Sequence, residues 1–420
     1  MNQRAALTDV VLIGVDGGAT EVKAHAVACD DPANPSSFEL RPASASRRYE
    51  RVPGFEPLPA AEQLAQRGGD DVRLSAAEEE QGAVWVEAAC QAIAEVARRC
   101  DAQRMLVGMG MPGLKTPDGR GICVINNGPR IPDYLDRLER GLRAAGVGLL
   151  SPVAALGSDA DYCGLGEQYA AEGLFRDVES AYYVGGGTGL ADAMKLRGRL
   201  MPFDEAKPWI LKSWEIRSAL GPTFEKLVSA RSLNQVYADL ASVAPVSNRW
   251  PPGVGPVSNR SIPGPGPVSG RSFGFPEAEA AAGEPLAVAW MNTAALVLAE
   301  LIFERMETIK NGREEAPHRG EGYLNLDRSH EYRGTLLDRV IVGQRLGQIY
   351  ADDSVGAAFG ENVDAYLAAF IAESGDAEMR ARYLEGNRLR PGFVRPSNLR
   401  AAPALGAAIA AVHALRNTKA

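Results

Sequence analysis

The stretch VVLIGVDGGATEVK, residues 10–23, ends an apolar run with one aspartate, Asp16, and follows it with a glycine-rich turn. Residues 10–15 have the composition of a buried strand, and residues 20–28 read as a second strand after the turn. A carboxylate at the tip of a buried strand, beside backbone with almost no side chains, needs a chemical reason.

Phosphate binding is one such reason. Backbone amides bared by Gly17 and Gly18, together with the Thr20 hydroxyl, form a nest for phosphate oxygens. Asp16 would repel phosphate unless a cation lay between them, and Mg²⁺ is usually held by one carboxylate, waters and phosphate oxygens. The stretch therefore indicates either a magnesium site on Asp16, reached through water, or a plain hairpin turn with an Asx cap.

A second turn of the same kind follows much later, in VGGGTGLADA at 184–193. The residues that would bare their amides to phosphate are Gly186, Gly187, Thr188 and Gly189. Two such turns predict two domains that close on one nucleotide, and the alternative is again a glycine-rich hairpin.

A third motif, LGSDADYCGLGE at 156–167, places Asp159 at the start of a predicted helix. Asp159 is either the N-cap of that helix or a general base that takes a proton from a hydroxyl as it attacks a phosphoryl group. The helix N-terminus would favour its ionised form.

Composition excludes several other classes of function. The chain has 420 residues, 45 % of them hydrophobic, and a formal net charge of -8, which argues against nucleic-acid and anionic-membrane partners. We expect no membrane span and no signal peptide. Five scattered cysteines without a CxxC motif predict a reduced, cytoplasmic protein, and four histidines without HExxH predict no metal cage.

One glycine motif is misleading. GMGMPG at 108–113 satisfies GxGxxG, the pattern of a dinucleotide site. That site needs a helix opening through the last glycine, whereas Pro112 precedes Gly113 and LKTPDGRG follows it. A P-loop is absent, and the alternation of strands and helices predicts an α/β fold.

Two segments look like insertions. Residues 30–75 are rich in Pro, Ser and Arg, and we expect a long surface excursion there. From Pro245 an eleven-residue unit runs three times, as PVSNRWPPGVG, PVSNRSIPGPG and PVSGRSFGFPE. Pro and Gly at this density exclude a helix or packed strand, so residues 245–276 are predicted to be an expanded surface loop or, alternatively, a docking motif.

In this order the motifs resemble those of the ROK family (repressors, open reading frames and kinases), a sugar-kinase branch of the actin-like ATPase superfamily. Eight segments carry the resemblance to DxGGTK, GxxxPG, NDxNxxALGE, GTGIGxGI, CLExxxSGxAL, the AxxGD helix, IVLGG and the closing GAA helix. They are DGGATE at 16–21, GMGMPG at 108–113, SDADYCGLGE at 158–167, GGTGLADAMKLRGRL at 186–200, TFEKLVSARSL at 223–233, AAAGEPLAVAWMNTAALVLAELIF at 280–303, VIVGQ at 340–344 and ALGAAIAAV at 404–412.

The resemblance implies a two-domain actin-like ATPase fold of the ribonuclease H-like type. The N-terminal domain would cover 1–158, the C-terminal domain 159–400, and a last helix at 401–420 would return to the first domain. It also implies ATP-dependent phosphorylation of a hexose or hexose derivative, with Asp159 as base. Gly343 would then lie near adenosine.

The acceptor side departs from the family. ROK sugar kinases carry GEIGH and a zinc-binding CxCGxxGC where this chain reads MPFDEAKPWILKSWEIRSALGP at 201–222, so we expect no zinc. Glu205 or Glu215 is a candidate to replace the missing glutamate, with Glu205 preferred. Asn126 and Asn127, in NNGP, are candidates for contacts with sugar hydroxyls together with Asp159, although an Asn-Gly turn is as good an account of them.

Two rivals to the sugar kinase stay open. One is a non-catalytic sugar sensor on the same fold, and the other is a BadF-type ATPase or N-acetylhexosamine kinase, which shares a DGGGT motif. The sugar identity, the oligomeric state (a homodimer among the options) and the phosphorylated hydroxyl are not set by the sequence.

Overall fold

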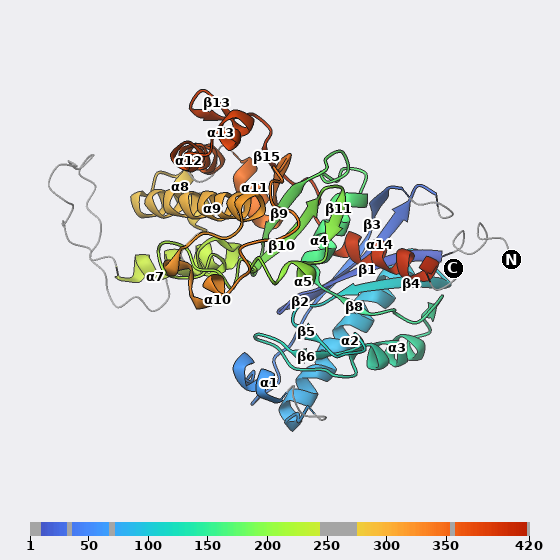
Figure 1. Ribbon diagram of the computed structural model, residues 1–420. Coiled ribbons are helices and arrows are strands. Elements are labelled where there is room, and N and C mark those ends of the chain that lie inside the picture. The colour runs from blue at the N-terminus through green and yellow to red at the C-terminus, as the bar shows by residue number, and fades with distance from the viewer. Residues whose placement is uncertain (1–9, 32–35, 67–71, 244–274, 353–357, 418–420) are drawn as a thin grey trace.

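The computed structural model describes residues 10–31, 36–66, 72–243, 275–352 and 358–417. Figure 1 shows two lobes, each built around one β-sheet. The first sheet has the strand order β3-β2-β1-β4-β7, and β8 also pairs with β4. Its strands are β1 (Val10–Gly17), β2 (Glu21–Cys29), β3 (Phe38–Arg48), β4 (Arg104–Gly110), β7 (Gly148–Leu149) and β8 (Leu156–Gly157).

The second sheet repeats this plan, with the order β11-β10-β9-β12-β15. In both sheets the central strand is antiparallel to the strand that follows it and parallel to its other neighbour. The strands of the second sheet are β9 (Ala181–Gly186), β10 (Leu190–Leu196), β11 (Arg199–Met201), β12 (Arg339–Gly343) and β15 (Val394–Pro396). The predicted α/β class with two domains is confirmed.

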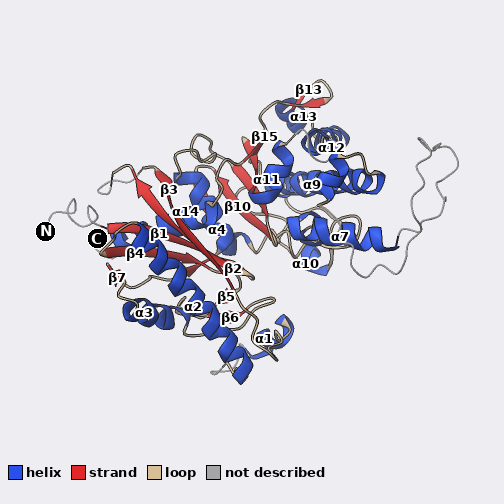
Figure 2. Cartoon of the chain, turned by 180° about the vertical axis from the view of Figure 1, so that it is seen from behind, coloured by secondary structure: helices blue, strands red, loops and turns tan. Residues whose placement is uncertain are grey.

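Helices cover the sheets in layers, as the view from behind in Figure 2 shows. Helices α2 (Ala76–Arg99) and α3 (Tyr134–Ala144) share one core with the outer face of the first sheet. Helices α4 (Asp159–Tyr169) and α14 (Ala402–Asn417) pack on each other and contact strands of both sheets, α14 on β1 and β4 and α4 on β9 and β10. Helices α9 (Pro285–Asn311) and α12 (Phe359–Glu373) belong to the core on the far face of the second sheet.

The remaining elements are short or peripheral. In the first half of the chain they are α1 (Ala60–Gln66), β5 (Leu114–Lys115), β6 (Ile122–Val124) and α5 (Phe203–Ala206). In the second half they are α6 (Glu225–Val228), α7 (Ala230–Val243), α8 (Pro276–Ala281), η2 (Pro317–Arg319), α10 (Glu321–Leu324), α11 (Gln344–Ala351), α13 (Ala377–Tyr383), β13 (Leu384–Glu385) and β14 (Arg388–Leu389).

Helix α14 lies directly on the backbone of the first sheet. A Cβ atom on Gly14 would lie 1.8 Å from the Ala404 carbonyl oxygen, and one on Gly108 would lie 1.8 Å from the Ala407 oxygen. Gly108 belongs to the misleading GxGxxG pattern, so this glycine serves helix packing. Because no side chain separates them, helix and sheet form a rigid base under the strand ends.

The surface excursion expected over 30–75 is wrong for its first part. Residues 38–48 form β3, the edge strand of the first sheet. The alternation of side chains was obscured by Pro42, which lies where the register between β2 and β3 shifts, a position that tolerates proline. Further along, Val52, Phe55 and Gln63 are buried, so this stretch packs on the domain as well.

The three-fold repeat falls almost wholly on residues 244–274, which lie outside the described residues, so its predicted loop remains a prediction. Helix α9 is long and apolar enough to span a membrane, with a mean hydropathy of 1.8, although no such run was expected from the sequence. In this structure α9 is a core helix, because 61 % of its most apolar 18-residue stretch is buried inside the protein.

Candidate active site

Asp16 stands at the end of β1, in the middle of the first sheet. Its Cα pairs with Gly110 of β4 on one side and with Lys23 of β2 on the other. The pKa of Asp16 is raised to about 6, chiefly by burial and next by the charge of Asp159; Lys23 opposes this rise and Glu21 adds to it. A half-buried carboxylate with too little positive charge around it fits the coordination of a cation.

Asp159 is the first residue of α4, just after β8. The N-cap is Ser158, whose hydroxyl accepts a hydrogen bond from the Asp161 amide at 3.4 Å, so Asp159 is not needed to cap the helix. A Cβ atom on Gly110 would lie 3.7 Å from the Asp159 Cα atom. Since Gly110 is also the register partner of Asp16, the two carboxylates emerge at the ends of β1 and β8, the strands that pair with β4 on either side of Gly110.

The first glycine turn leaves backbone donors free. The Gly18 amide donates to the Glu21 carbonyl at 2.8 Å, and the Thr20 carbonyl accepts from the Tyr49 amide at 3.0 Å. The amides of Ala19 and Thr20 have no protein acceptor in the described ranges. Free amides next to a carboxylate are what a magnesium-bound phosphate group requires.

The second turn, between β9 and β10, has the same character. The Gly187 amide donates to the Gly189 carbonyl at 2.9 Å, while the amides of Thr188 and Gly189 have no acceptor among the described residues. Glu225 braces the turn from outside, because its carboxylate accepts from the Leu190 amide at 2.9 Å. Both turns therefore offer free N–H groups at the ends of central strands.

Gly343 ends β12 beside this second turn. The next residue, Gln344, has a φ of 58°, a left-handed conformation that favours glycine. This explains why the resembling motif, IVLGG, has glycine where this chain has Gln344. The Gln344 side chain crosses the turn: its Oε1 would lie 2.7 Å from a Cβ on Gly187, and its Nε2 donates to the Cys163 sulfur at 3.7 Å.

Asn126 and Asn127 lie in an exposed turn after β6. Two residues that the sequence did not single out fix this turn. The buried Gln63 of α1 bonds both the amide and the carbonyl of Ile125, at 2.8 and 2.9 Å, and Gly128 packs on the Trp85 ring. The two asparagines are held in place, but the described residues show no contact between them and Asp159.

No described contact joins Asp159 to either expected replacement for the family glutamate. Glu205 is exposed on α5 and forms an ion pair with Arg199 of β11. Glu215 accepts from the Lys212 amide at 3.0 Å, which closes a local turn. Neither glutamate is joined by a described contact to the Asp16–Asp159 pair.

Other residues of the window 201–222 approach Asp161, two residues after Asp159. Asp161 accepts a hydrogen bond from the Phe203 amide at 3.2 Å, and burial raises the pKa of Asp161. Lys212 lies over the Phe203 ring, 5.3 Å from its centroid. Apolar packing orders the window: Trp209 is buried and stacks on His330 with ring centroids 4.0 Å apart.

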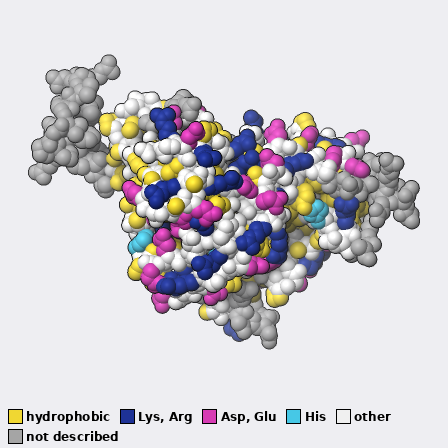
Figure 3. Space-filling view, turned by 45° about the horizontal axis from the view of Figure 1, so that its top comes forward, with side chains coloured by type: hydrophobic (Ala, Val, Ile, Leu, Met, Phe, Trp, Pro, Cys, Tyr) yellow, Lys and Arg dark blue, Asp and Glu magenta, His cyan; other side chains and the backbone are white. Residues whose placement is uncertain are grey.

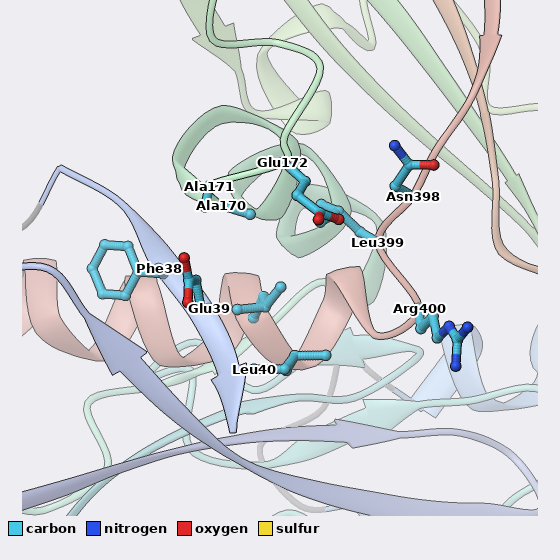
Figure 4. Close-up of a pocket in the computed structure, with 10 residues that line it drawn as sticks. Phe38, Glu39, Leu40, Ala170, Ala171, Glu172, Asn398, Leu399 and Arg400 are labelled. Carbon is cyan, nitrogen blue, oxygen red and sulfur yellow. The ribbon is translucent and has the colours of Figure 1, made fainter. Parts of the chain in front are cut away.

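Two features of the surface lie away from these strand ends. Figure 3 shows acidic and basic side chains interspersed over the face in view, with neither sign dominating. A cavity of about 390 Å³ opens at the far end of α4, between β3 and the loop before α14. Figure 4 shows that Glu39, Glu172 and Arg400 line it; α4 is 11 residues long, so this cavity is about 16 Å from Asp159.

Comparison with known proteins gives the fold. Neither a family model nor a curated protein matches the sequence. Among solved structures, the chain is similar to a putative sugar kinase from Cytophaga hutchinsonii, with 14 % identity, a TM-score of 0.52 and 95 % and 99 % of the two chains covered.

It is similar to a ROK hexokinase from Thermus thermophilus, with 16 % identity, a TM-score of 0.51 and 97 % and 100 % coverage. It is also similar to a ROK family transcriptional regulator, a homolog of the E. coli MLC protein, with 12 % identity, a TM-score of 0.50 and coverage of 97 % of this chain and 79 % of that one. The chain has the two-domain, actin-like ATPase fold of the ROK sugar kinases.

Proposed function

We propose that the protein is an ATP-dependent sugar kinase that transfers the γ-phosphoryl group to a hydroxyl of a hexose or hexose derivative. The observation that carries this proposal is the placement of Asp159 beside Asp16, at strand ends next to a turn with free amides. A second such turn, on the second sheet, supports a site shared by both domains. Fold similarity to sugar kinases at low identity is consistent with it.

In this account each residue has a distinct role. The amides of Ala19, Thr20, Thr188 and Gly189 bind phosphate oxygens, and Thr20 adds its hydroxyl. Asp16 would hold Mg²⁺, which when bound would supply positive charge to neutralise the phosphates. Gly343 and the start of α11 lie beside the phosphate turn and form the nucleotide side of the site.

Asp159 acts as the general base. The acceptor hydroxyl attacks the γ-phosphorus, its proton passes to the Asp159 carboxylate, and the bond from the γ-phosphorus to the bridging oxygen breaks as ADP leaves. Because the transition state is largely dissociative, most of the acceleration comes from positioning and charge, with the base contributing about 10²–10⁴-fold.

A non-catalytic sugar sensor is the second candidate. The fold similarity to a ROK transcriptional regulator favours it, and the departures from the family pattern at 201–222 fit a changed role for the acceptor side. A cytoplasmic location, Mg²⁺ dependence and the absence of zinc are part of the kinase proposal and rest on the sequence.

A coupled assay of ADP release tests the proposal. Neutral hexoses, N-acetylhexosamines, sugar acids and sugar phosphates are each added with Mg-ATP, and at least one is expected to raise ADP release well above the rate with ATP alone. Binding of a sugar with no increase in ADP release for any of them would favour the sensor.

A further inference from the structure

Two lysines that the proposed mechanism does not use lie near the start of α4: the charge of Lys115 interacts with Asp159, and that of Lys212 with Asp161. Lys115 comes from β5 in the first domain, and Lys212 comes from the turn after α5 in the second domain. Both are half-buried, and neither forms an ion pair with a carboxylate in the part of the chain that is described. Figure 1 shows β5 and α5 near one another between the two lobes.

Lys115 is held by the backbone that follows β4. Its Nζ donates to the carbonyls of Met111 at 2.6 Å and Gly113 at 2.7 Å, while the Pro112 carbonyl is 3.4 Å away. Since the third distance exceeds an ordinary N–H···O bond, the bond to Pro112 is the weakest of the three, and that N–H is the one that another acceptor could take over. The Met111 amide in turn donates to the Gly157 carbonyl, two residues before Asp159.

Lys212 is held just as firmly by a network below it. The next residue, Ser213, donates to Asp192 from both its amide, at 2.9 Å, and its hydroxyl, at 2.7 Å. Asp192 is buried and also accepts from Tyr182 at 2.5 Å. The Lys212 amide is fixed by Glu215, so the turn is anchored on the second sheet while the Lys212 ammonium lies over Phe203.

The charges that surround Asp16 and Lys115 overlap only at Asp159. The groups that act electrostatically on Asp16 are Asp159, Lys23 and Glu21, and neither lysine is among them. Lys115 responds instead to Asp159, Lys212, Cys123 and Asp161. Lys115 therefore interacts with the proposed base and not with the proposed magnesium carboxylate, and the acceptor has to bind next to that base.

Carboxylates near the two lysines are already engaged. Asp161 accepts from the Phe203 amide, and Asp204 is paired with Lys207 at 2.5 Å. Burial lowers the pKa of Lys115 to about 8, against the opposing pull of Asp159, so its charge is poorly compensated. An anion bound between the two ammonium groups would compensate both, since charged groups that leave water need a partner.

We propose that the acceptor carries an anionic group, a carboxylate or a phosphate, and that Lys115 and Lys212 bind this group while Asp159 faces the hydroxyl to be phosphorylated. The inference rests on the proposed kinase function and narrows its substrate to acidic sugars. In this proposal Lys115 and Lys212 select the acceptor, and they take no part in the transfer of the phosphoryl group.

The test compares matched acceptors in the kinase assay. Gluconate and glucuronate carry a carboxylate, glucose 6-phosphate carries a phosphate, and glucose carries neither. We expect kcat/KM for one of the acidic acceptors to exceed that for glucose by about tenfold or more, which corresponds to one good ionic contact. The acid with the highest kcat/KM shows whether the site prefers a carboxylate or a phosphate.

Variants of Lys212 then locate the effect. Lys212→Gln should raise KM for the acidic acceptor at least about tenfold, with a much smaller change in kcat/KM for glucose, and Lys212→Arg should restore most of the loss. Lys115→Gln should act in the same direction. Lys207→Gln is the control, because Lys207 is exposed and paired with Asp204.

Two results would overturn the inference while leaving the kinase intact: a preference for glucose over all the acids, or an equal loss for neutral and acidic acceptors in Lys212→Gln. If no acceptor is phosphorylated, the kinase proposal fails, and calorimetric titration of the acids without ATP decides this inference. Binding of an acid that is lost in Lys212→Gln supports it, and no binding of any acid overturns it.

Discussion

The two sheets have the same strand order but opposite chemistry at their tips. In the first sheet the central strand ends in Asp16, in register with Gly110. In the second sheet the corresponding positions are Gly185 and Gly343, in register with each other. One half therefore supplies carboxylates and the other supplies only backbone, which is what a magnesium–phosphate group held from two sides requires.

The difference has a packing cause. Tyr183 of β9 lies directly beneath the ends of β9 and β12, so a Cβ atom on Gly343 would lie 2.2 Å from its hydroxyl oxygen and one on Gly185 would lie 2.6 Å from it. In the first sheet, the Asp16 side chain has room beside Asp159. The second sheet thus excludes side chains where the first one uses them.

Removing the proposed base, Asp159, should have the largest effect. Asp159→Asn keeps the shape and the Ser158 cap but cannot take a proton, so we expect kcat to fall at least about 10²-fold while ATP still binds. Steady-state kinetics and a nucleotide-binding titration measure the two effects.

Asp161→Asn is the matched comparison, because Asp161 is two residues on and anchors the Phe203 amide. It should alter KM for the acceptor more than kcat. A near-normal kcat in Asp159→Asn would remove Asp159 from the role of base.

Adding a side chain at the end of β12, in the second sheet, should destabilise the protein. Gly343→Ala drives a methyl group into Tyr183 and should lower the free energy of unfolding by about 1–3 kcal/mol, with weaker ATP binding. Gly322→Ala is the control, since its nearest neighbour, the Leu211 Cδ1 atom, is 3.7 Å from the new Cβ. Equal stability of the two variants in urea unfolding would show that Tyr183 gives way easily.

At neutral pH the ionised Asp16 side chain should lower the free energy of unfolding of the protein without nucleotide. Its folded pKa, about 6, is above the ordinary value of 3.8, so the folded state holds the proton more tightly and stability falls as pH rises from about 4 to above 6. Asp16→Asn removes this cost and should raise the free energy of unfolding by about 1 kcal/mol at pH 8, with a smaller gain near pH 4.5.

Urea unfolding of both proteins without nucleotide at the two pH values measures this effect. The same variant should lose Mg²⁺-dependent turnover, because Asp16 is the proposed anchor of the cation. A gain that does not depend on pH would place its cause outside the Asp16 carboxyl group.

The smallest effect is expected from the repeat. The free-energy cost of closing a surface loop changes by only about 0.6 kcal/mol when its length is halved or doubled. Replacing residues 245–275 with a short Gly-Ser linker should therefore leave the melting temperature and kcat nearly unchanged. A large loss of either would mean that this segment packs on the domain or takes part in the site.

Local patterns predicted the elements whose periodicity is uninterrupted. The β9–β10 turn and the long helix α9 lie where the glycine motif at 184–193 and the helix motif at 280–303 were expected. Strand β3 was missed because Pro42 and the serines around it hide the alternation, and its role is set by pairing with β2. The bracing by Gln63 was missed because it depends on contacts across 62 positions of sequence.

The residues of the candidate site also fall into two groups, those with a local sequence signal and those without one. Asp16 and Asp159 were singled out because each follows a strand and opens a turn or helix, and the structure brings them together. Glu205 was preferred by its position in the chain, but its ion pair with Arg199 holds it on the surface. Lys115 and Lys212 carry no local signal, because their relation to Asp159 arises only when two distant segments meet.

Transfer of isotope from labelled ATP tests the central claim most directly. The protein is incubated with ATP carrying ¹⁸O on the γ-phosphoryl group and with a mixture of neutral and acidic sugars, and the products are analysed by mass spectrometry. The account predicts that the label appears in a sugar phosphate, with Asp159→Asn giving almost none. Label found only in inorganic phosphate, or remaining in ATP while a sugar is bound, would contradict it.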